Sequence, residues 1–374
     1  MKFGDLIRPA TALGFDGDRL KLLDHLVTGG ITDRLYPSAV YVVMRHGMVA
    51  AHGAFGHAQP DAAPPVVTAT DTVFDIASLT KSFTGTVLMQ AIQRGEILLS
   101  QPVSSLFPEA TTSPIAHVTV RQLATHTSGL PAWKPLYKLP AGEVVNDILH
   151  TPTENEPGTH YTYSDLGYIL LGTILSKLGG APLNELAHKQ IFAPLGMKDT
   201  GYLPDRHLHS RIAATAHSRD RVGVTNVGVV HDENANGLGG VAGHAGIFST
   251  AEDLCRFAIS LQYASTASHF GLPQLLGAAA RRVSQHSLIV DEKVGSHGVG
   301  WFIWPNPYLL IGDLLSPAAF GHTGFTGTML LFEPQLDVTL ILLTNRVYMA
   351  TDGGGGIIRL RRQFANIALG AVND

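Results

Sequence analysis

Ser78 and Lys81 lie three positions apart, in a segment (Ser78-Leu79-Thr80-Lys81) that follows a short apolar run and opens a helical pattern. At this spacing two side chains share one face of a helix, one turn apart. A serine hydroxyl becomes a good nucleophile only when a neighbouring group accepts its proton, and a partly desolvated lysine can do so. The N–H groups at a helix start also favour a developing oxyanion. Alone the pair is a weak signal, because Ser78 could simply cap the helix.

Two further segments carry reactive side chains. Tyr163 and Asp165 begin the helical pattern YSDLGYILLGTIL. The tyrosine could pack under a loop, or it could be a phenol that relays protons beside a lysine charge. His322-Thr323-Gly324 lies in FGHTGFTGTMLLF, whose small residues would let a substrate lie along the edge of a strand. The alternative for this triplet is an ordinary strand and turn, where Gly and Thr are common.

Taken in this order, the three segments resemble the motifs of the serine β-lactamase and penicillin-binding protein superfamily. The similarity is greatest to the class C side, which includes D-alanyl-D-alanine carboxypeptidases, D-aminopeptidases and family VIII carboxylesterases. The resemblance extends over about residues 36–346. The phrases that carry it are LATHTSGLP (123–131), PGTHYTYSDLGYILLG (157–172) and GHAGIFSTAEDL (243–254).

A longer phrase, VVHDENANGLGGVAGHAG (229–246), is similar to a narrower bacterial subgroup. That subgroup contains carboxypeptidase-like penicillin-binding proteins and N-acetylmuramyl-L-alanine amidases of cell-wall recycling. The later phrases GHTGFTGT and ILLTNR indicate the same subgroup.

The resemblance implies a role for each motif residue. Ser78 would be acylated, and Lys81 and Tyr163 would share the base and acid roles, in an order that stays open. The backbone N–H groups of Ser78 and Phe325 would form the oxyanion hole. Thr323 and Gly324 would lie beside the substrate.

Two positions depart from the family pattern. Asp165 stands where the family has Asn, and an ionised carboxylate cannot donate a hydrogen bond to a substrate amide. His322 stands where many relatives have Lys. Because histidine loses its charge near neutral pH, we expect any recognition of a substrate carboxylate by His322 to depend on pH.

His231, Asp232 and His244 raise the possibility of a metal site. An acidic segment in a glycine-rich loop more often makes turn and capping hydrogen bonds. We therefore expect His231 and Asp232 to belong to a substrate-contacting loop over the pocket, and we expect no metal and no cofactor.

Strand-like segments at both ends of the chain bracket a middle of helices and loops. Residues 39–44 and 49–55 read as a hairpin, and residues 298–304, 326–334 and 337–345 read as successive strands. Helical patterns cover residues 17–27, 81–94, 119–125, 163–178, 251–263 and 357–369. We therefore expect an α/β fold: an antiparallel sheet flanked by N- and C-terminal helices (1–81 and 295–374), with an inserted, mostly helical region (82–294) and the active site between them.

Composition excludes some classes of function. The chain has 374 residues and a net charge of −4, without a dense Lys/Arg run, so nothing favours nucleic acid. Its nearest basic run, residues 359–362 (RLRR), is expected to be a solvated helix end. The single cysteine, Cys255, rules out an intramolecular disulfide and is expected to be a buried small hydrophobe.

No targeting segment is visible in the sequence. Asp5 and Arg8 interrupt the apolar residues near the start, unlike a secretory signal. The chain also has no apolar run of about 18 residues, the length that a membrane span needs. We expect a cytoplasmic protein that does not cross a membrane.

These observations predict a serine hydrolase that forms a covalent acyl-enzyme on ester or amide bonds. The alternative is a non-catalytic binding or sensor protein on the same fold, which the presence of both Ser78 and Lys81 disfavours. Short-chain esters, β-lactams, D-amino-acid peptides and muramyl peptides all suit this chemistry. The substrate and the oligomeric state stay open.

Overall fold

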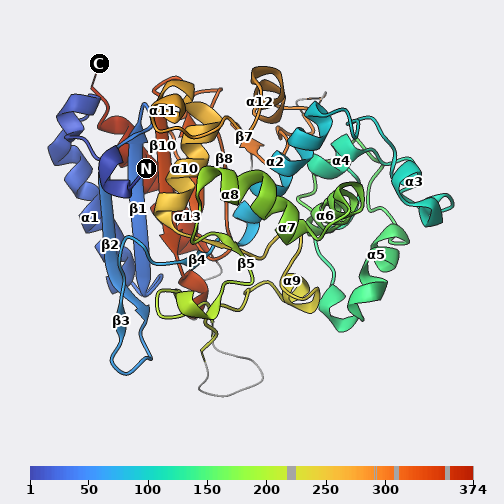
Figure 1. Cartoon of the computed structure of the whole chain (residues 1–374), viewed down its shortest axis with the longest axis horizontal. Coiled ribbons are helices and arrows are strands. Elements are labelled where there is room, and N and C mark those ends of the chain that lie inside the picture. Colours follow the sequence, from blue (N-terminus) through green and yellow to red (C-terminus); the bar gives the residue numbers. More distant parts are fainter. Residues whose placement is uncertain (217–224, 290, 292, 307–310, 350–353, 374) are drawn as a thin grey trace.

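A seven-stranded antiparallel sheet forms one half of the described part of the chain, and a cluster of helices forms the other half (Figure 1). The structure is a computed structural model that describes residues 1–216, 225–289, 291, 293–306, 311–349 and 354–373. In spatial order the sheet contains β3 (Val66–Val67), β2 (Met48–Gln59), β1 (Ser38–Arg45), β10 (Val338–Thr344), β9 (Met329–Glu333), β8 (Phe320–Thr323) and β7 (Phe302–Ile303).

The predicted hairpin is present as β1 and β2. Its turn places His46 and Gly47 in the left-handed region, with φ of 53° and 76°, which matches the right-handed twist of paired strands. β1 also pairs with β10, so that Ala39 lies opposite Thr344 and Arg45 opposite Val338. The first and last strands of the chain are therefore neighbours in the middle of the sheet.

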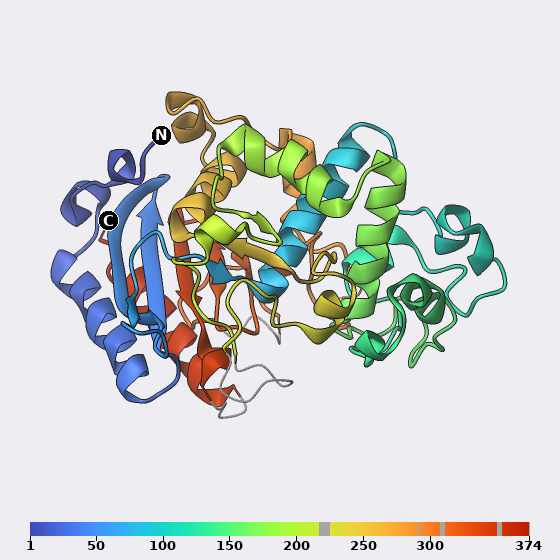
Figure 2. The same cartoon turned by 60° about the horizontal axis from the view of Figure 1, so that its bottom comes forward.

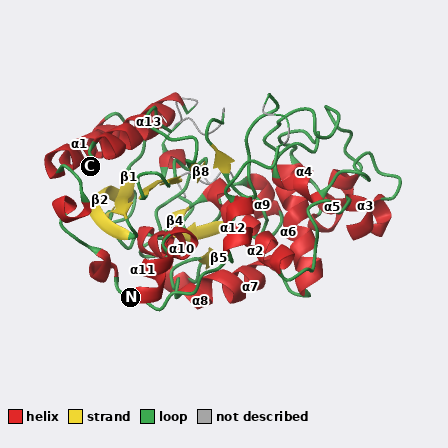
Figure 3. Cartoon of the chain, turned by 90° about the horizontal axis from the view of Figure 1, so that it is seen from above, coloured by secondary structure: helices red, strands yellow, loops and turns green. Residues whose placement is uncertain are grey.

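Both faces of the sheet are covered. Along β1, Val40, Val42 and Met44 point into the core shared with the helical region. Alternate residues of the same strand (Ala39, Tyr41 and Val43) point into a second core, as the two-residue period of a strand requires. The second core lies under α1 (Gly17–Thr32) and α13 (Gly355–Gly370), which pack side by side on the outer face (Figure 3).

The helical region is built around α2 (Thr80–Gln93). This helix crosses the middle of the molecule (Figure 2) and is buried along nearly its whole length. The other helices of the region are α3 (Val103–Leu106), α4 (Val120–Ala124), α5 (Ala141–Leu149), α6 (Asp165–Gly179), α7 (Leu183–Ala187), α8 (Ala193–Leu195), α9 (Glu233–Gly237), α10 (Ala251–Gln262), α11 (Ala264–His269) and α12 (Ala278–Ser284).

A small second sheet joins the two halves. In it β4 (Phe74–Asp75) pairs with β6 (Ile247–Ser249), which pairs with β5 (Gly201–Tyr202). Short 3-10 turns complete the described chain: η1 (Phe3–Leu6), η2 (Ala10–Leu13), η3 (Ala77–Leu79), η4 (Pro108–Ala110), η5 (Leu136–Lys138), η7 (Arg206–Leu208) and η8 (Arg346–Tyr348), with a π-turn, η6 (His188–Phe192).

Within the described residues, no single helix combines the length and apolar composition that a membrane crossing needs. One bent pair, α6 with Leu183–Leu195, meets that test only when its two helices are counted together.

The predicted fold class is confirmed: an antiparallel sheet with flanking terminal helices and a mostly helical region between its strands. The domain boundaries at residues 81/82 and 294/295 stay a prediction. One helix differs from expectation, because α6 begins at Asp165 and leaves Tyr163 in the loop before it. The small second sheet was not predicted, because its strands are only two or three residues long. Cys255 is buried as expected.

Candidate active site

Ser78 lies in η3, at the entry to α2, and Lys81 lies on the first turn of that helix. The Lys81 Nζ donates a hydrogen bond to Ser78 Oγ at 3.1 Å, as the spacing predicted. The Lys81 side chain is completely buried, whereas Ser78 borders a cavity. The pair therefore combines a hydroxyl at the edge of a cavity with a lysine side chain that is buried away from water.

Lys81 has two further oxygen neighbours. Its Nζ lies 2.7 Å from Asp165 Oδ1, an ion pair between the first turns of α2 and α6. It also donates to the backbone carbonyl of His244 at 3.2 Å. A buried ammonium is tolerated only with such partners, so Asp165 supplies the counter-charge that this lysine needs.

The segment that carries His244 lies close against α2. Thr84 Oγ1 donates to the carbonyl of Gly243 at 2.7 Å, and the N–H of Ile247 donates to Thr80 Oγ1 at 3.2 Å. A Cβ on Gly243 would lie 2.1 Å from the backbone oxygen of Tyr168 in α6. Only glycine fits against α6 at this point, which explains the glycine at position 243.

Ser78 follows a strained residue. Ala77 has a φ of 48°, which is uncommon for a residue with a side chain. Its N–H donates to Asp75 Oδ1 at 2.8 Å. From the β8–β9 connection, Thr326 donates to the carbonyl of Asp75 and Thr328 donates to the carbonyl of Ile76. These bonds hold the backbone that presents Ser78.

The Asp75 carboxylate connects two walls of the site. Its second oxygen accepts the N–H of His231 at 2.8 Å. Burial raises the pKa of Asp75 to about 6, although the hydrogen bonds from His231 and Ala77 oppose the shift. Asp75 thus joins the Ser78 backbone to the loop that begins at His231.

Tyr163 lies in the loop just before Ser164, the N-cap residue of α6. Its ring centroid lies 4.5 Å from that of His126 and 5.5 Å from that of Phe302. Lys81 Nζ lies 4.8 Å from the centre of the same ring. The tyrosine is therefore packed between aromatic rings, with the lysine charge beside it.

Most of the predicted side chains surround one cavity of about 350 Å³. Two rim aromatics, Trp133 and Phe325, are 47% and 61% exposed. Among described residues that line this cavity, three carry carboxylates and none carries an ammonium or guanidinium group. The lining residues are Ala77, Ser78, Trp133, Tyr163, Asp165, His231, Asp232, Glu233, Ala245 and Phe325. Trp133, Glu233 and Ala245 were not predicted as site residues, although Glu233 and Ala245 lie within the 229–246 phrase.

His231 and Asp232 form part of the cavity wall, as expected for a loop over the pocket. The His231 ring stacks on Phe325, with ring centroids 5.7 Å apart. Asp232 caps α9 through the N–H of Ala235 and contacts His244 Nε2 at 2.8 Å. Burial alone would raise the pKa of Asp232, but the charge and hydrogen bond of His244 outweigh burial and lower it.

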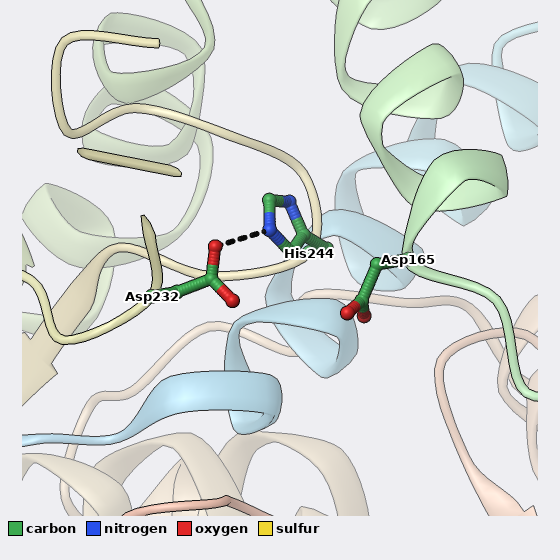
Figure 4. A group of neighbouring side chains, drawn as sticks. All are labelled: Asp165, Asp232 and His244. Carbon is green, nitrogen blue, oxygen red and sulfur yellow. Dashed lines mark hydrogen bonds and ion pairs between the residues drawn. The ribbon is translucent and has the colours of Figure 1, made fainter. Parts of the chain in front are cut away.

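Three potential metal-ligand groups lie close together: Asp165, Asp232 and His244, with their ligand atoms within 4.8 Å of one another (Figure 4). This set contains Asp165 in place of the His231 that the sequence suggested. The Lys81 ammonium already lies 2.7 Å from Asp165, and His244 already contacts Asp232. Each of the three residues therefore already has one close internal partner.

The structure corrects the predicted role of His322. Its side chain is completely buried and stacks on Phe302, with ring centroids 4.4 Å apart. Burial, and then the charge of Lys81, lowers the pKa of His322 well below the usual histidine value. The lowered pKa favours the neutral ring, and His322, like Thr323 and Gly324, does not line the cavity. Burial and the lowered pKa therefore disfavour the predicted reading of an anionic group through the charge of His322. Substrate contact by Thr323 and Gly324 stays a prediction.

The prediction that residues 359–362 form a solvated helix end is wrong for Arg361. Arg361 is buried and donates to the carbonyls of Gly324 and Thr328 at 2.7 and 2.8 Å. Burial, and then the charge of Arg346, lowers its pKa to about 9. Arg361 lies on the apolar face of α13 with Ile357 and Phe364. This helical spacing could have predicted that Arg361 is buried. Arg361 holds the β8–β9 turn that carries Phe325.

Three comparisons with known proteins show the family and the fold of this chain. A family model described as Beta-lactamase matches residues 23–363. A protein of Escherichia coli (strain K12), provisionally named D-alanyl-D-alanine carboxypeptidase, is 30% identical over 369 residues, which cover 89% of this chain and 83% of that protein.

Two solved structures share the fold. One is described as EstCE1, a hydrolase with promiscuous acyltransferase activity, with a TM-score of 0.74 and 19% identity over 96% of this chain and 99% of that chain. The other is described as a beta-lactamase/D-alanine carboxypeptidase from Pseudomonas syringae, with a TM-score of 0.73 and 21% identity over 95% of this chain and 99% of that chain.

Proposed function

The chain belongs to the beta-lactamase family, and from this premise we propose that it is a serine hydrolase in which Ser78 forms a covalent acyl-enzyme. The observation that carries the proposal is the 3.1 Å hydrogen bond from a fully buried Lys81 to a Ser78 hydroxyl at the edge of a cavity. A seryl ester intermediate divides one difficult hydrolysis into two easier steps.

Lys81 and Tyr163 share the proton transfers in this mechanism. We propose that Lys81 is an ammonium paired with Asp165, which cannot accept a proton, and that Tyr163 accepts the Ser78 proton as a phenolate beside that ammonium. Ser78 Oγ then bonds to the substrate carbonyl carbon, and the bond to the leaving oxygen or nitrogen breaks. The leaving group takes the proton from Tyr163. Water releases the acyl group by the reverse sequence.

The negative charge that develops on the carbonyl oxygen needs hydrogen-bond donors. We assign this role to the backbone N–H groups of Ser78 and Phe325, which border the same cavity. The N-terminus of α2 adds a favourable dipole at Ser78. Arg361 and the strained Ala77 act indirectly, by holding the two backbone segments in place.

Two features of the cavity bear on the substrate. Asp232 and Glu233 place carboxylates in the lining, whereas the Asp165 carboxylate is paired with Lys81, and we propose that the two acidic groups disfavour a substrate carboxylate beside them. Asp165 also cannot donate to the side-chain amide of a β-lactam while it is ionised. We therefore propose measurable hydrolysis of short-chain esters and weak β-lactam hydrolysis at most.

The natural substrate is proposed from the resemblances. The E. coli relative is named for D-alanyl-D-alanine peptides, and EstCE1 for acyl transfer, while the 229–246 phrase favours amide bonds in muropeptide fragments. A turnover panel separates these classes: a p-nitrophenyl ester, a chromogenic cephalosporin, a D-Ala-D-Ala peptide and N-acetylmuramyl-L-alanine. A cytoplasmic location is part of the proposal and is checked by cell fractionation.

The nucleophile is tested by covalent labelling. A fluorophosphonate should add its mass to the protein, and peptide mapping should place that mass on Ser78. The Ser78→Ala variant should neither be labelled nor turn over p-nitrophenyl butyrate, because it lacks the hydroxyl that is proposed to form the acyl-enzyme. Full activity in this variant would end the proposal.

A further inference from the structure

His126 contacts the backbone on both sides of Tyr163. The N–H of Thr162 donates to the carbonyl of His126 at 2.9 Å, and the N–H of Ser164 donates to His126 Nδ1 at 3.0 Å. The loop that follows His126 continues the contact, since the N–H of Asp165 donates to the carbonyl of Ala132 at 3.0 Å. One loop therefore holds the whole segment from residue 162 to residue 165.

The His126 ring also supports the Tyr163 ring directly. The two ring centroids lie 4.5 Å apart, and other sides of the imidazole meet Tyr168 at 5.0 Å and His297 at 4.7 Å. His126 is only 1% exposed. Because a side chain packed on several sides cannot shift without moving its neighbours, the imidazole provides a rigid support for the phenol.

The conformation and protonation of His126 suit this contact. Its φ of 59° is left-handed, which is unfavourable for a residue with a side chain and requires compensating contacts. Nδ1 accepts a hydrogen bond and so carries no proton. Burial, followed by the charges of His297 and Lys81, lowers the pKa of His126 well below the usual histidine value, which favours this neutral form.

We propose that His126 is a positioning residue for Tyr163: its carbonyl, its Nδ1 and its ring together fix the tyrosine beside Lys81. The proposal rests on the proposed function, since it assumes that Tyr163 transfers protons. His126 does not line the cavity within the described residues, so it acts through Tyr163 and not on the substrate. Neither the Thr125–Gly129 sequence nor the three family motifs assign it this role.

The experiment compares two substitutions with different chemistry. His126→Asn keeps an acceptor close to the position of Nδ1 and tolerates a left-handed backbone but loses the ring, so its kcat should lie between those of the native protein and His126→Ala. His126→Ala removes the side-chain acceptor and the ring. Because small misplacements of a catalytic group can cost up to about 10²-fold, we expect kcat for p-nitrophenyl butyrate to fall by about 10- to 100-fold, with little change in KM.

His46→Ala is the matched control. It makes the same chemical change at another left-handed position, φ 53°, in the β1–β2 turn away from the cavity lining. Its kcat should be unchanged. Melting temperatures of all variants show whether each protein is folded at the assay temperature.

A second background separates positioning from general support of the fold. In Tyr163→Phe, which lacks the reacting hydroxyl, adding His126→Ala should cause no further loss of kcat. An equal loss in both backgrounds would overturn the proposal, as would an Asn variant as damaged as the Ala variant, or full activity in His126→Ala. Fluorophosphonate labelling of Ser78 in the native protein reports on the proposed function separately. If Ser78 is labelled but His126→Ala causes the same loss of kcat in the native and Tyr163→Phe backgrounds, the proposed nucleophile stands and only the positioning role of His126 is refuted.

Discussion

Lys81 is the residue on which the other side chains of the site depend. Its ammonium has three oxygen neighbours: the Ser78 hydroxyl, the Asp165 carboxylate and the His244 carbonyl. Removing one partner of a buried ion pair costs about 3–5 kcal/mol, because it leaves a buried charge uncompensated. Ser78 can therefore be substituted at little cost to stability, whereas Lys81 and Asp165 are coupled to each other.

Lys81 and Tyr163 should behave as one functional unit. We expect Lys81→Ala and Tyr163→Phe each to lower kcat by at least about 10²-fold, the low end for general acid–base catalysis. The double variant should be little worse than either single variant, because both serve one proton-transfer step. Steady-state kinetics with p-nitrophenyl butyrate measures this. Losses that simply multiply would show independent roles.

Asp165→Asn tests the departure from the family pattern. An asparagine can donate to the side-chain amide of a β-lactam, whereas an ionised aspartate cannot. We expect the kcat/KM for a chromogenic cephalosporin to rise relative to that for p-nitrophenyl butyrate. Asp147→Asn is the matched control, because Asp147 pairs with Lys134 outside the cavity lining. An unchanged ratio in Asp165→Asn would show that position 165 does not select the substrate.

His322 should not act as a pH switch. Burial keeps its pKa well below 6.5, so its charge does not change in the neutral range. The ratio of KM values for an anionic ester and a matched neutral ester, such as mono-p-nitrophenyl succinate and p-nitrophenyl butyrate, should stay constant between about pH 6 and 8. A step near pH 6.5 that disappears in His322→Gln would restore the charged role.

At the scale of elements, β4 is small but central. Its last residue, Asp75, accepts hydrogen bonds from Ala77 and His231, and its carbonyl accepts one from Thr326. These bonds connect the entry to α2, the cavity loop and the β8–β9 turn. Three segments that are distant in sequence thus converge on a two-residue strand.

Asp75 should make stability depend on pH. Because folding raises its pKa from 3.8 to about 6, its contribution to the unfolding free energy is complete below pH 3.8 and is lost as pH rises through 6. Asp75→Asn removes this titration. The native-minus-variant difference in unfolding free energy should therefore fall by about 2 kcal/mol between about pH 4 and pH 7.

Denaturant unfolding at a series of pH values measures that difference. Asp253 is also buried with a pKa raised to about 6, but it titrates in both proteins and cancels in the subtraction. A difference that is flat with pH would show that Asp75 titrates normally.

At the scale of the whole molecule, the first and last strands of the chain meet in the sheet, and the C-terminal helix reaches the turn beside the cavity. β1 and β10 pair in the middle of the sheet, and α13 lies beside α1 on its outer face (Figure 3). From α13, Arg361 reaches through to the turn that carries Phe325. The C-terminal helix therefore supports the same cavity as the helix that begins after Ser78.

The whole protein should need no metal. In the proposed mechanism the chain supplies the nucleophile, the proton carriers and the oxyanion donors, and Lys81 lies 2.7 Å from Asp165. Dialysis against EDTA should leave p-nitrophenyl butyrate turnover unchanged. A loss that only added zinc restores would assign a role to the Asp165, Asp232 and His244 group.

The sequence by itself determined the features that depend on local spacing. A three-residue separation on a helix places Ser78 beside Lys81, and a glycine after His46 makes the β1–β2 turn. Apolar periodicity located the long helices and most strands of the large sheet, but not the two-residue β3. These features follow from the periods of helix and strand, which do not depend on the rest of the chain.

Only the tertiary structure decided the rest, because burial and long-range contact are not properties of a local pattern. It removed His322 from solvent and so from a charged role, and it turned Arg361 inward against Gly324. It also placed Asp232, from a loop 154 positions after Ser78, in the same cavity wall. The burial of each of these residues depends on which distant segment covers it. Burial matters for function because removal from water disfavours the charged form of a side chain.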